Sequence, residues 1–179
     1  MNQGYFCETH RQVHNVLTRE LQRRRFDYKH RDYESESYSF SFSTGRLLYD
    51  AANIYLEAGR GHSSLTEGSY YLRMALGIGF NAVEAYINTV TGQFQVRPNQ
   101  TTAPIDRQIE YLFTKLSTEP LDQTSSDWNE FTLALKLRDE LQRSRTPSRI
   151  DVSAIERALV SIRSLLNALN NGIYGSRWA

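Results

Sequence analysis

The sequence predicts an all-α protein: a single-domain helical bundle of five to six helices. Three stretches support this class. Residues 152–173 place apolar side chains at alternating steps of three and four for more than twenty residues, which is typical of a helix packed along one seam. Residues 66–91 are apolar on nearly every face, as expected of a helix in the middle of a bundle, and residues 45–58 carry a clear apolar stripe. A chain of 179 residues is long enough to bury such a core without disulfides or metals.

The N-terminal part reads differently from the rest. Residues 5–26 show a moderate helical pattern, and residues 22–31 mix basic with aromatic side chains. Serine then alternates with Tyr38, Phe40 and Phe42 at period two, which predicts a short strand or an extended arm laid on the helices over residues 36–44. We therefore divide the chain into residues 1–44, an N-terminal helix and extended arm, and residues 45–179, the helical bundle, which together form one folded unit.

Short sequence signals place the remaining helix ends. Pro104 suits the first turn of a helix that ends before Pro120, and a turn-rich connector leads to the helix at residues 128–145. A glycine is expected to end the last helix at position 172. Capping-box spacing predicts the starts of three helices, at the pairs Ser64 and Glu67, Asp127 and Glu130, and Ser153 and Glu156.

Composition excludes several classes of protein. The 21 basic and 20 acidic residues leave a net charge of +1, so the chain lacks the overall field of a dedicated nucleic-acid protein. A single cysteine excludes an internal disulfide, and with no apolar leader segment we expect a cytoplasmic protein. The apolar stretch at 66–91 is not read as a membrane span, because Arg73 and Glu84 lie within it. The histidines form no metal-ligand pattern and no phosphate-binding glycine loop is present, so we expect no cofactor.

One arginine stands out on the apolar side of a helix. Arg138 lies one turn from Ala134 and Leu141 and two turns from Phe131, the side that should face the core. A guanidinium in that place needs a partner. The central helix offers one, since a polar stripe runs along its otherwise apolar surface through Gly77, Asn81, Glu84 and Asn88. We predict a Glu84–Arg138 ion pair, which would either hold two helices in register or form part of a functional site.

Three segments together resemble the HEPN superfamily of helical domains. They read FNAVEAYIN at residues 80–88, LKLRDEL at 135–141 and ALNNGIY at 168–174, and the resemblance extends over about residues 45–175. It implies a helical bundle that forms a homodimer. Active HEPN members carry an arginine, a polar residue directly after it, and a histidine that is separated from the arginine by four to six residues. Two such motifs meet at the dimer interface and cleave RNA without a metal.

The match to that motif is incomplete. Arg138 corresponds to the motif arginine, Asp139 to the polar residue after it, and Glu84 to an acidic position on the facing helix, but Arg143, Ser144 and Arg145 stand where the histidine should be. Arginine cannot exchange protons near neutral pH, whereas it can hold phosphate. The resemblance therefore implies a non-catalytic domain that binds RNA, a nucleotide or a protein partner. The candidate binding residues are Arg138, Asp139, Glu84, Asn81, Asn88, Arg143 and Arg145.

Two other functions stay open on the sequence alone. One is a toxin-like, metal-independent endoribonuclease with an altered active site, in which Arg138 would be catalytic. The other is a purely structural interaction bundle, for example one half of a toxin–antitoxin pair with an antitoxin-type partner. The basic stretch at residues 22–31 adds a further ambiguity, since it suits either an RNA-contacting surface or a solvated helix end.

Overall fold

The computed structural model describes residues 11, 15, 33–62, 65–96, 103–144 and 150–178. Within these residues the chain forms five α-helices and no strand, which confirms the all-α, single-domain bundle. The helices are α2 (Tyr33–Gly61), α3 (Leu65–Gln93), α4 (Ile105–Leu116), α5 (Ser126–Arg143) and α6 (Val152–Tyr174). The helix predicted at 5–26, apart from residues 11 and 15, and the basic stretch at 22–31 lie outside the described residues.

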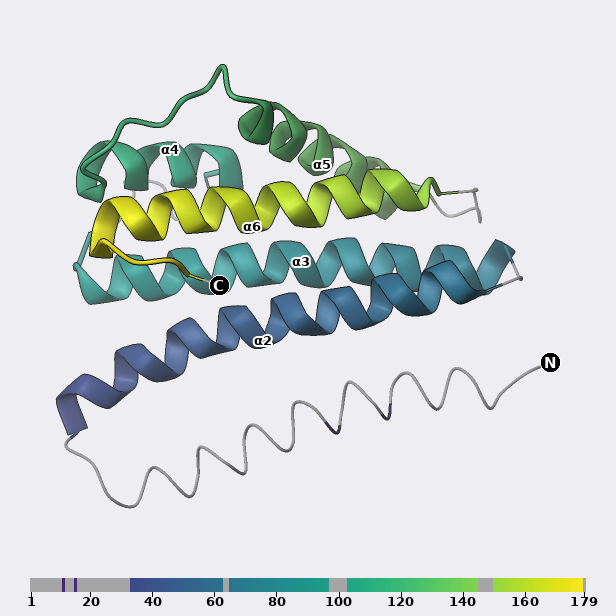
Figure 1. The fold of residues 1–179 in the computed structure, drawn as a ribbon, viewed down its shortest axis with the longest axis horizontal. Helices are drawn as coiled ribbons and strands as arrows, with labels where there is room; N and C mark the ends of the chain where they lie inside the picture. Colours follow the sequence, from purple (N-terminus) through teal and green to yellow (C-terminus); the bar gives the residue numbers. More distant parts are fainter. Residues whose placement is uncertain are drawn as a thin grey trace.

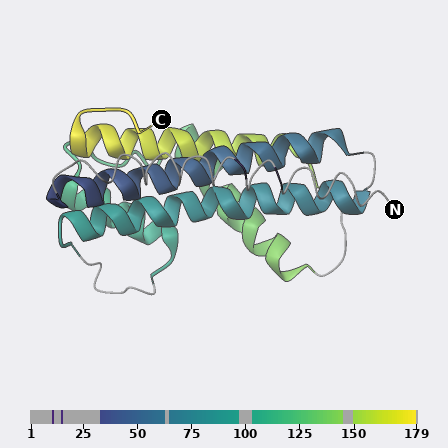
Figure 2. The same ribbon diagram turned by 90° about the horizontal axis from the view of Figure 1, so that it is seen from below.

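The helix α3 is the centre of the bundle. It packs against α2 along most of its length and also contacts α4, α5 and α6. In the view of Figure 1, α2 is drawn on one side of α3, and α6, α4 and α5 on the other; Figure 2 gives a second direction, and α6 is also in direct contact with α2. The sequence prediction of a central helix with apolar residues on most faces is confirmed.

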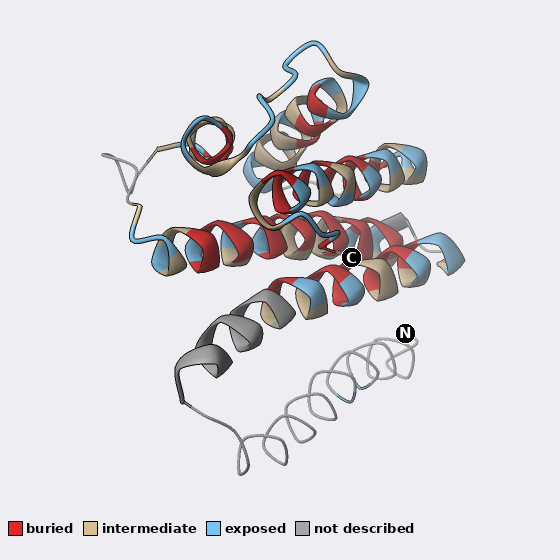
Figure 3. Cartoon of the chain, turned by 60° about the vertical axis from the view of Figure 1, so that its left-hand side comes forward, coloured by how far each residue is buried: buried red, intermediate tan, exposed pale blue. Residues whose placement is uncertain are grey.

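The apolar core runs between the helices, and buried segments face inward in Figure 3. The polar stripe of α3, in contrast, is not buried. Asn81, Glu84 and Asn88 are exposed, so the stripe faces solvent and not a polar partner in the core. Although α3 contacts all the other described helices, one face of it stays in contact with solvent, and its buried residues occupy the rest of its circumference.

The predicted extended arm at residues 36–44 is wrong, because α2 begins at Tyr33 and is continuous through this segment. The predicted boundary between residues 44 and 45 consequently falls inside a helix. So short an alternating segment fits a helix as well as a strand. Positions 38, 42, 45 and 49 are separated by four, three and four residues, which places them on one face of a helix. Gly45 fits this helix for a packing reason: a Cβ there would lie 3.2 Å from the Ala82 carbonyl oxygen of α3.

Three predicted helix ends shift by a few residues. The N-cap of α5 is Ser125, whose hydroxyl accepts a hydrogen bond from the Trp128 N–H, and the N-cap of α6 is Asp151, which accepts from the Ser153 N–H. The helix α6 continues past Gly172 to Tyr174 and is capped by Gly175, where φ is +66°. In each case the residue that caps the helix lies two or three positions from the predicted one, and its residue type is equally suited to capping. Ser64, the predicted cap of α3, lies outside the described residues.

The segment after α6 folds back over the bundle (Figure 1). Trp178 is only 7% exposed and contacts Tyr49 of α2 and Tyr86 of α3 edge-on, at ring distances of 5.9 and 6.2 Å. Its backbone N–H donates to the Asn167 side chain, and the Asn170 amide donates to the Ser176 carbonyl oxygen. The end of the described chain thus completes the core between α2, α3 and α6.

No helix in the described part of the chain has the length and apolar character that crossing a membrane requires.

Candidate functional site

Arg138 occupies the place on α5 that its sequence position predicts. Its guanidinium carbon lies 4.7 Å from the centre of the Phe80 ring on α3, and its side chain is 20% exposed. Phe131, two turns earlier on α5, packs on the same ring at 5.7 Å between centroids. The arginine therefore continues the apolar face of α5 over Phe80, where a cation–π contact compensates part of its desolvation.

The predicted Glu84–Arg138 ion pair is not formed. Arg138 pairs instead with Asp139, its neighbour in sequence, through Nη2 at 3.0 Å and Nε at 3.2 Å from the same carboxylate oxygen. Glu84 is exposed on α3. The reason is the direction of α5, which runs from Phe131 beside Phe80 to Leu141 beside Arg73. Arg138 consequently lies toward Arg73, whereas Glu84 lies one turn beyond Phe80 in the other direction.

A second arginine joins the site from α3. Nη1 of Arg73 donates hydrogen bonds to the carbonyl oxygens of Leu141 and of Ser144, the latter at 2.9 Å. These carbonyls belong to the last turn and the C-cap of α5, where backbone acceptors lack helical partners and the helix dipole is negative. Arg73 thus fixes the end of α5 against α3 and places a second positive charge near Arg138.

A cavity of about 230 Å³ lies between these two arginines. Its lining consists of Arg73, Leu76, Gly77, Arg138, Leu141 and Gln142. A Cβ at Gly77 would meet no atom within 4 Å, so this wall is open. The polar residues of the lining are Arg73, Arg138 and Gln142, and guanidinium groups are donors of the kind that bind an oxyanion such as phosphate. None of the six residues can exchange a proton near neutral pH, so the lining supplies binding and not acid–base chemistry.

The structure brings together only part of the predicted site. Asn81 and Asn88 are exposed on α3, and Arg143 is exposed in the last turn of α5. None of the three lines the cavity around Arg138, and Arg145 lies outside the described residues. Among the described residues no group of three or more histidine, cysteine, aspartate or glutamate side chains is placed to hold a metal ion.

Sequence analysis missed three members of the site. Arg73 stands one turn before Gly77, next to the polar stripe of α3, but it was not included among the candidate binding residues. Phe80 and Gln142 gave no signal, because a phenylalanine in a core helix and a glutamine near a helix end are ordinary. Their role depends on how α5 crosses α3, which no local pattern encodes.

Comparison of the chain with protein-family models gives no match, and comparisons with curated proteins and with solved structures give no significant match. The HEPN resemblance therefore stays a prediction that rests on its three sequence segments.

Proposed function

We propose that this protein is a HEPN-like helical domain that binds RNA or a nucleotide through phosphate without cleaving it. The observation that supports the proposal best is the cavity between α3 and α5, which Arg73 and Arg138 both line. Arg138 is the residue that corresponds to the arginine of the HEPN motif. A pair of arginines is well suited to a phosphate, because guanidinium groups bind its oxygens through charge-assisted hydrogen bonds.

The non-catalytic part of the proposal has its own support. Arg143 and Ser144 stand at two of the positions where the motif histidine would be, and no lining residue of the cavity replaces it as a proton carrier.

From the same resemblance we propose a homodimer. Light scattering of the purified protein tests this point, and a strictly monomeric mass at high concentration would contradict it.

Replacing Arg138 with glutamine should weaken RNA binding about tenfold, because one charge-assisted hydrogen bond to phosphate is lost. The measurement is fluorescence anisotropy of a labelled single-stranded RNA at several salt concentrations. The slope of log K against log salt should become shallower by about one.

The matched control is Arg163→Gln, which removes the same charge from an exposed position on α6. Equal losses in both variants would mean nonspecific charge attraction, and absence of wild-type binding at low salt would overturn the proposal. Metal-independent cleavage of the RNA that disappears in Arg138→Gln would instead support the ribonuclease alternative.

Replacing Asp139 with asparagine should tighten RNA binding about two- to fivefold. The Asp139 carboxylate is half exposed and occupies Nε and Nη2 of Arg138, so it competes with any phosphate for these donors. The same anisotropy titration measures the effect. Glu140→Gln, an identical charge change at the next, exposed position of α5, is the control. An equal gain in the control would show that only the overall charge matters.

A further inference from the structure

The cavity between α3 and α5 that Arg73 and Arg138 line, called the arginine cavity, has no aromatic residue in its lining. Its six lining residues, all of them described, are two arginines, two leucines, one glycine and one glutamine. Proteins that bind nucleic acid through its bases usually stack the bases on aromatic side chains. The lining of the arginine cavity offers a base no such ring.

The ring that contacts Arg138 is not open to a base either. Phe80 is only 1% exposed. The guanidinium carbon of Arg138 lies 4.7 Å from the centre of this ring, and the Phe131 ring packs on it at 5.7 Å. Side chains of the protein itself therefore surround Phe80, and its role is to support Arg138.

The size of the arginine cavity also limits what it can hold. Sites that enclose a drug-sized ligand have volumes of about 300–1,000 Å³. The arginine cavity, at about 230 Å³, is smaller than these sites. It can take a phosphate group and part of a sugar, and a base attached to that sugar would remain in solvent.

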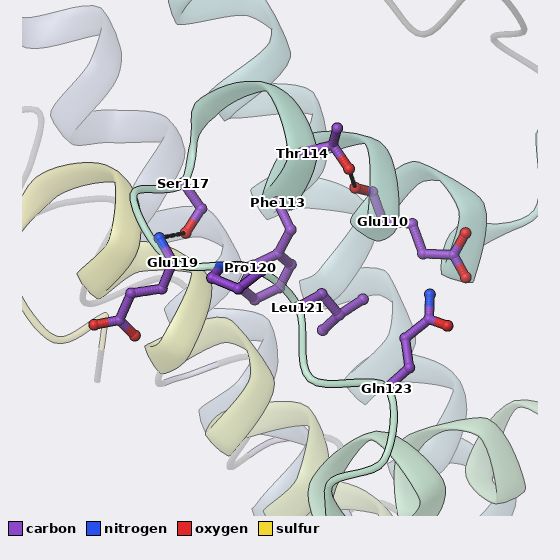
Figure 4. Close-up of a pocket in the computed structure, with 8 residues that line it drawn as sticks. All are labelled: Glu110, Phe113, Thr114, Ser117, Glu119, Pro120, Leu121 and Gln123. Atoms are coloured by element: carbon purple, nitrogen blue, oxygen red, sulfur yellow. Dashed lines mark hydrogen bonds between the residues drawn. The ribbon is translucent and has the colours of Figure 1, made fainter.

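A larger hollow of about 410 Å³ lies between the C-terminal half of α4 and the connector to α5, and it does not offer the base a place (Figure 4). It shares no lining residue with the arginine cavity. Its aromatic residue, Phe113, is buried, and Glu110 and Glu119 carry negative charges that repel phosphate. This hollow therefore cannot serve as the second half of a nucleotide site.

The chain on either side of the arginine cavity supplies one exposed ring to consider. Residues 145–149, which follow the C-cap of α5, contain no aromatic residue. The exposed aromatic residue closest to Arg73 along α3 is Tyr70, about one turn earlier. Tyr70 is not part of the lining, and its ring packs edge-on with Tyr71 at 5.7 Å. Its replacement therefore belongs in any test of base recognition.

We propose that the arginine cavity binds a phosphate group of a nucleic-acid backbone without regard to the base attached to it. This assignment rests on the proposed function and narrows its ligand from RNA or a nucleotide to the sugar–phosphate backbone of a strand. Phosphate contacts carry no sequence information, so any phosphate along the strand can occupy the cavity. Binding should consequently be independent of sequence.

The test is an NMR titration of the ¹⁵N-labelled protein with ribose 5-phosphate, uridine 5′-monophosphate and uridine. The two phosphate compounds should shift amide signals of residues 73–77 and 138–142 with equal affinity, and uridine should shift none of them. A base that stacks on the protein would make uridine 5′-monophosphate bind about fivefold or more tightly than ribose 5-phosphate. That preference would overturn the base-independent assignment and leave phosphate binding in place. Absence of shifts with both phosphate compounds would overturn the proposed function, and the assignment with it.

Two variants, each checked for native folding by circular dichroism, locate the binding. Arg138→Gln should weaken both phosphate compounds by the same factor, about tenfold, and unchanged affinities would place the binding outside the arginine cavity. Tyr70→Ala should leave both affinities unchanged. A loss for uridine 5′-monophosphate alone would identify Tyr70 as a stacking residue and contradict the proposal.

A last titration distinguishes a strand from a free sugar phosphate. A short oligouridylate should bind more tightly than ribose 5-phosphate, because each of its phosphates offers an equivalent way to occupy the cavity. Equal or tighter binding of ribose 5-phosphate would assign the cavity to a small sugar phosphate and overturn the assignment to a strand.

Discussion

An alanine in place of Phe131 should lower the free energy of unfolding by about 3–5 kcal/mol. Phe131 is 0% exposed and lies between two other rings, Phe80 of α3 and Trp128 of its own helix, at 5.7 Å from each. Removing the ring deletes buried apolar surface and leaves a cavity, because both neighbouring rings are anchored on helices that cannot close the space. Urea unfolding followed by circular dichroism measures the change.

The control for this prediction lies on the same helix. Leu133 is 55% exposed, so Leu133→Ala should change the free energy of unfolding by no more than about 0.5 kcal/mol. A loss below about 1 kcal/mol for Phe131→Ala would be incompatible with the packing of α5 on α3. The arginine cavity, which that packing creates, would then have no structural basis.

A methyl group at position 172 should destabilise the protein by about 1–3 kcal/mol. A Cβ on Gly172 would lie 2.0 Å from the Ser117 hydroxyl oxygen and 3.1 Å from the Ser117 Cβ. Rotating the Ser117 hydroxyl away would break the hydrogen bond that it accepts from the Glu119 N–H, and the Ser117 Cβ would still be too close to the new methyl group. The clash therefore outweighs the helix propensity that alanine gains over glycine.

Two variants make this result specific. Gly92→Ala is a control in α3, since a Cβ there meets no atom within 4 Å, and it should be neutral or stabilising by up to about 1 kcal/mol. Combining Gly172→Ala with Ser117→Gly removes the clashing side chain and should give a non-additive recovery of stability. The comparison is made by thermal and urea unfolding of the wild type, the single variants Gly172→Ala and Ser117→Gly, the double variant and the Gly92→Ala control. Strict additivity in the double variant would contradict the close approach of α4 and α6.

The class of fold was predictable because several long segments carry unambiguous helical periodicity. The central position of α3 follows from apolar residues on most of its faces, and the apolar seam of α6 is buried at Ile155, Leu159, Ile162 and Leu166. The segment at 36–44 was misread because nine alternating residues satisfy two periods, and the choice depends on the rest of α2. Helix ends shifted wherever two capping residues stand within a few positions of each other.

The candidate site was predictable only in part. Periodicity correctly gives the face of α5 on which Arg138 lies, but it carries no information on what that face meets. The Phe80 ring and the Asp139 carboxylate take the role that was assigned to Glu84. Likewise, the contact of Arg73 with the end of α5 joins residues about seventy positions apart, and only the crossing of two helices brings them together.

The packing of the two tryptophans gives the protein a built-in pair of optical reporters. Trp128 is stacked on Phe131 in α5, whereas Trp178 is seated against α2 and α3 beyond the end of α6. The chain contains only these two. Emission from single-tryptophan variants therefore reads the outer layer and the central layer of the bundle separately. Coincident denaturation curves would mean that both layers melt as one cooperative unit, and separated curves would give each layer its own stability.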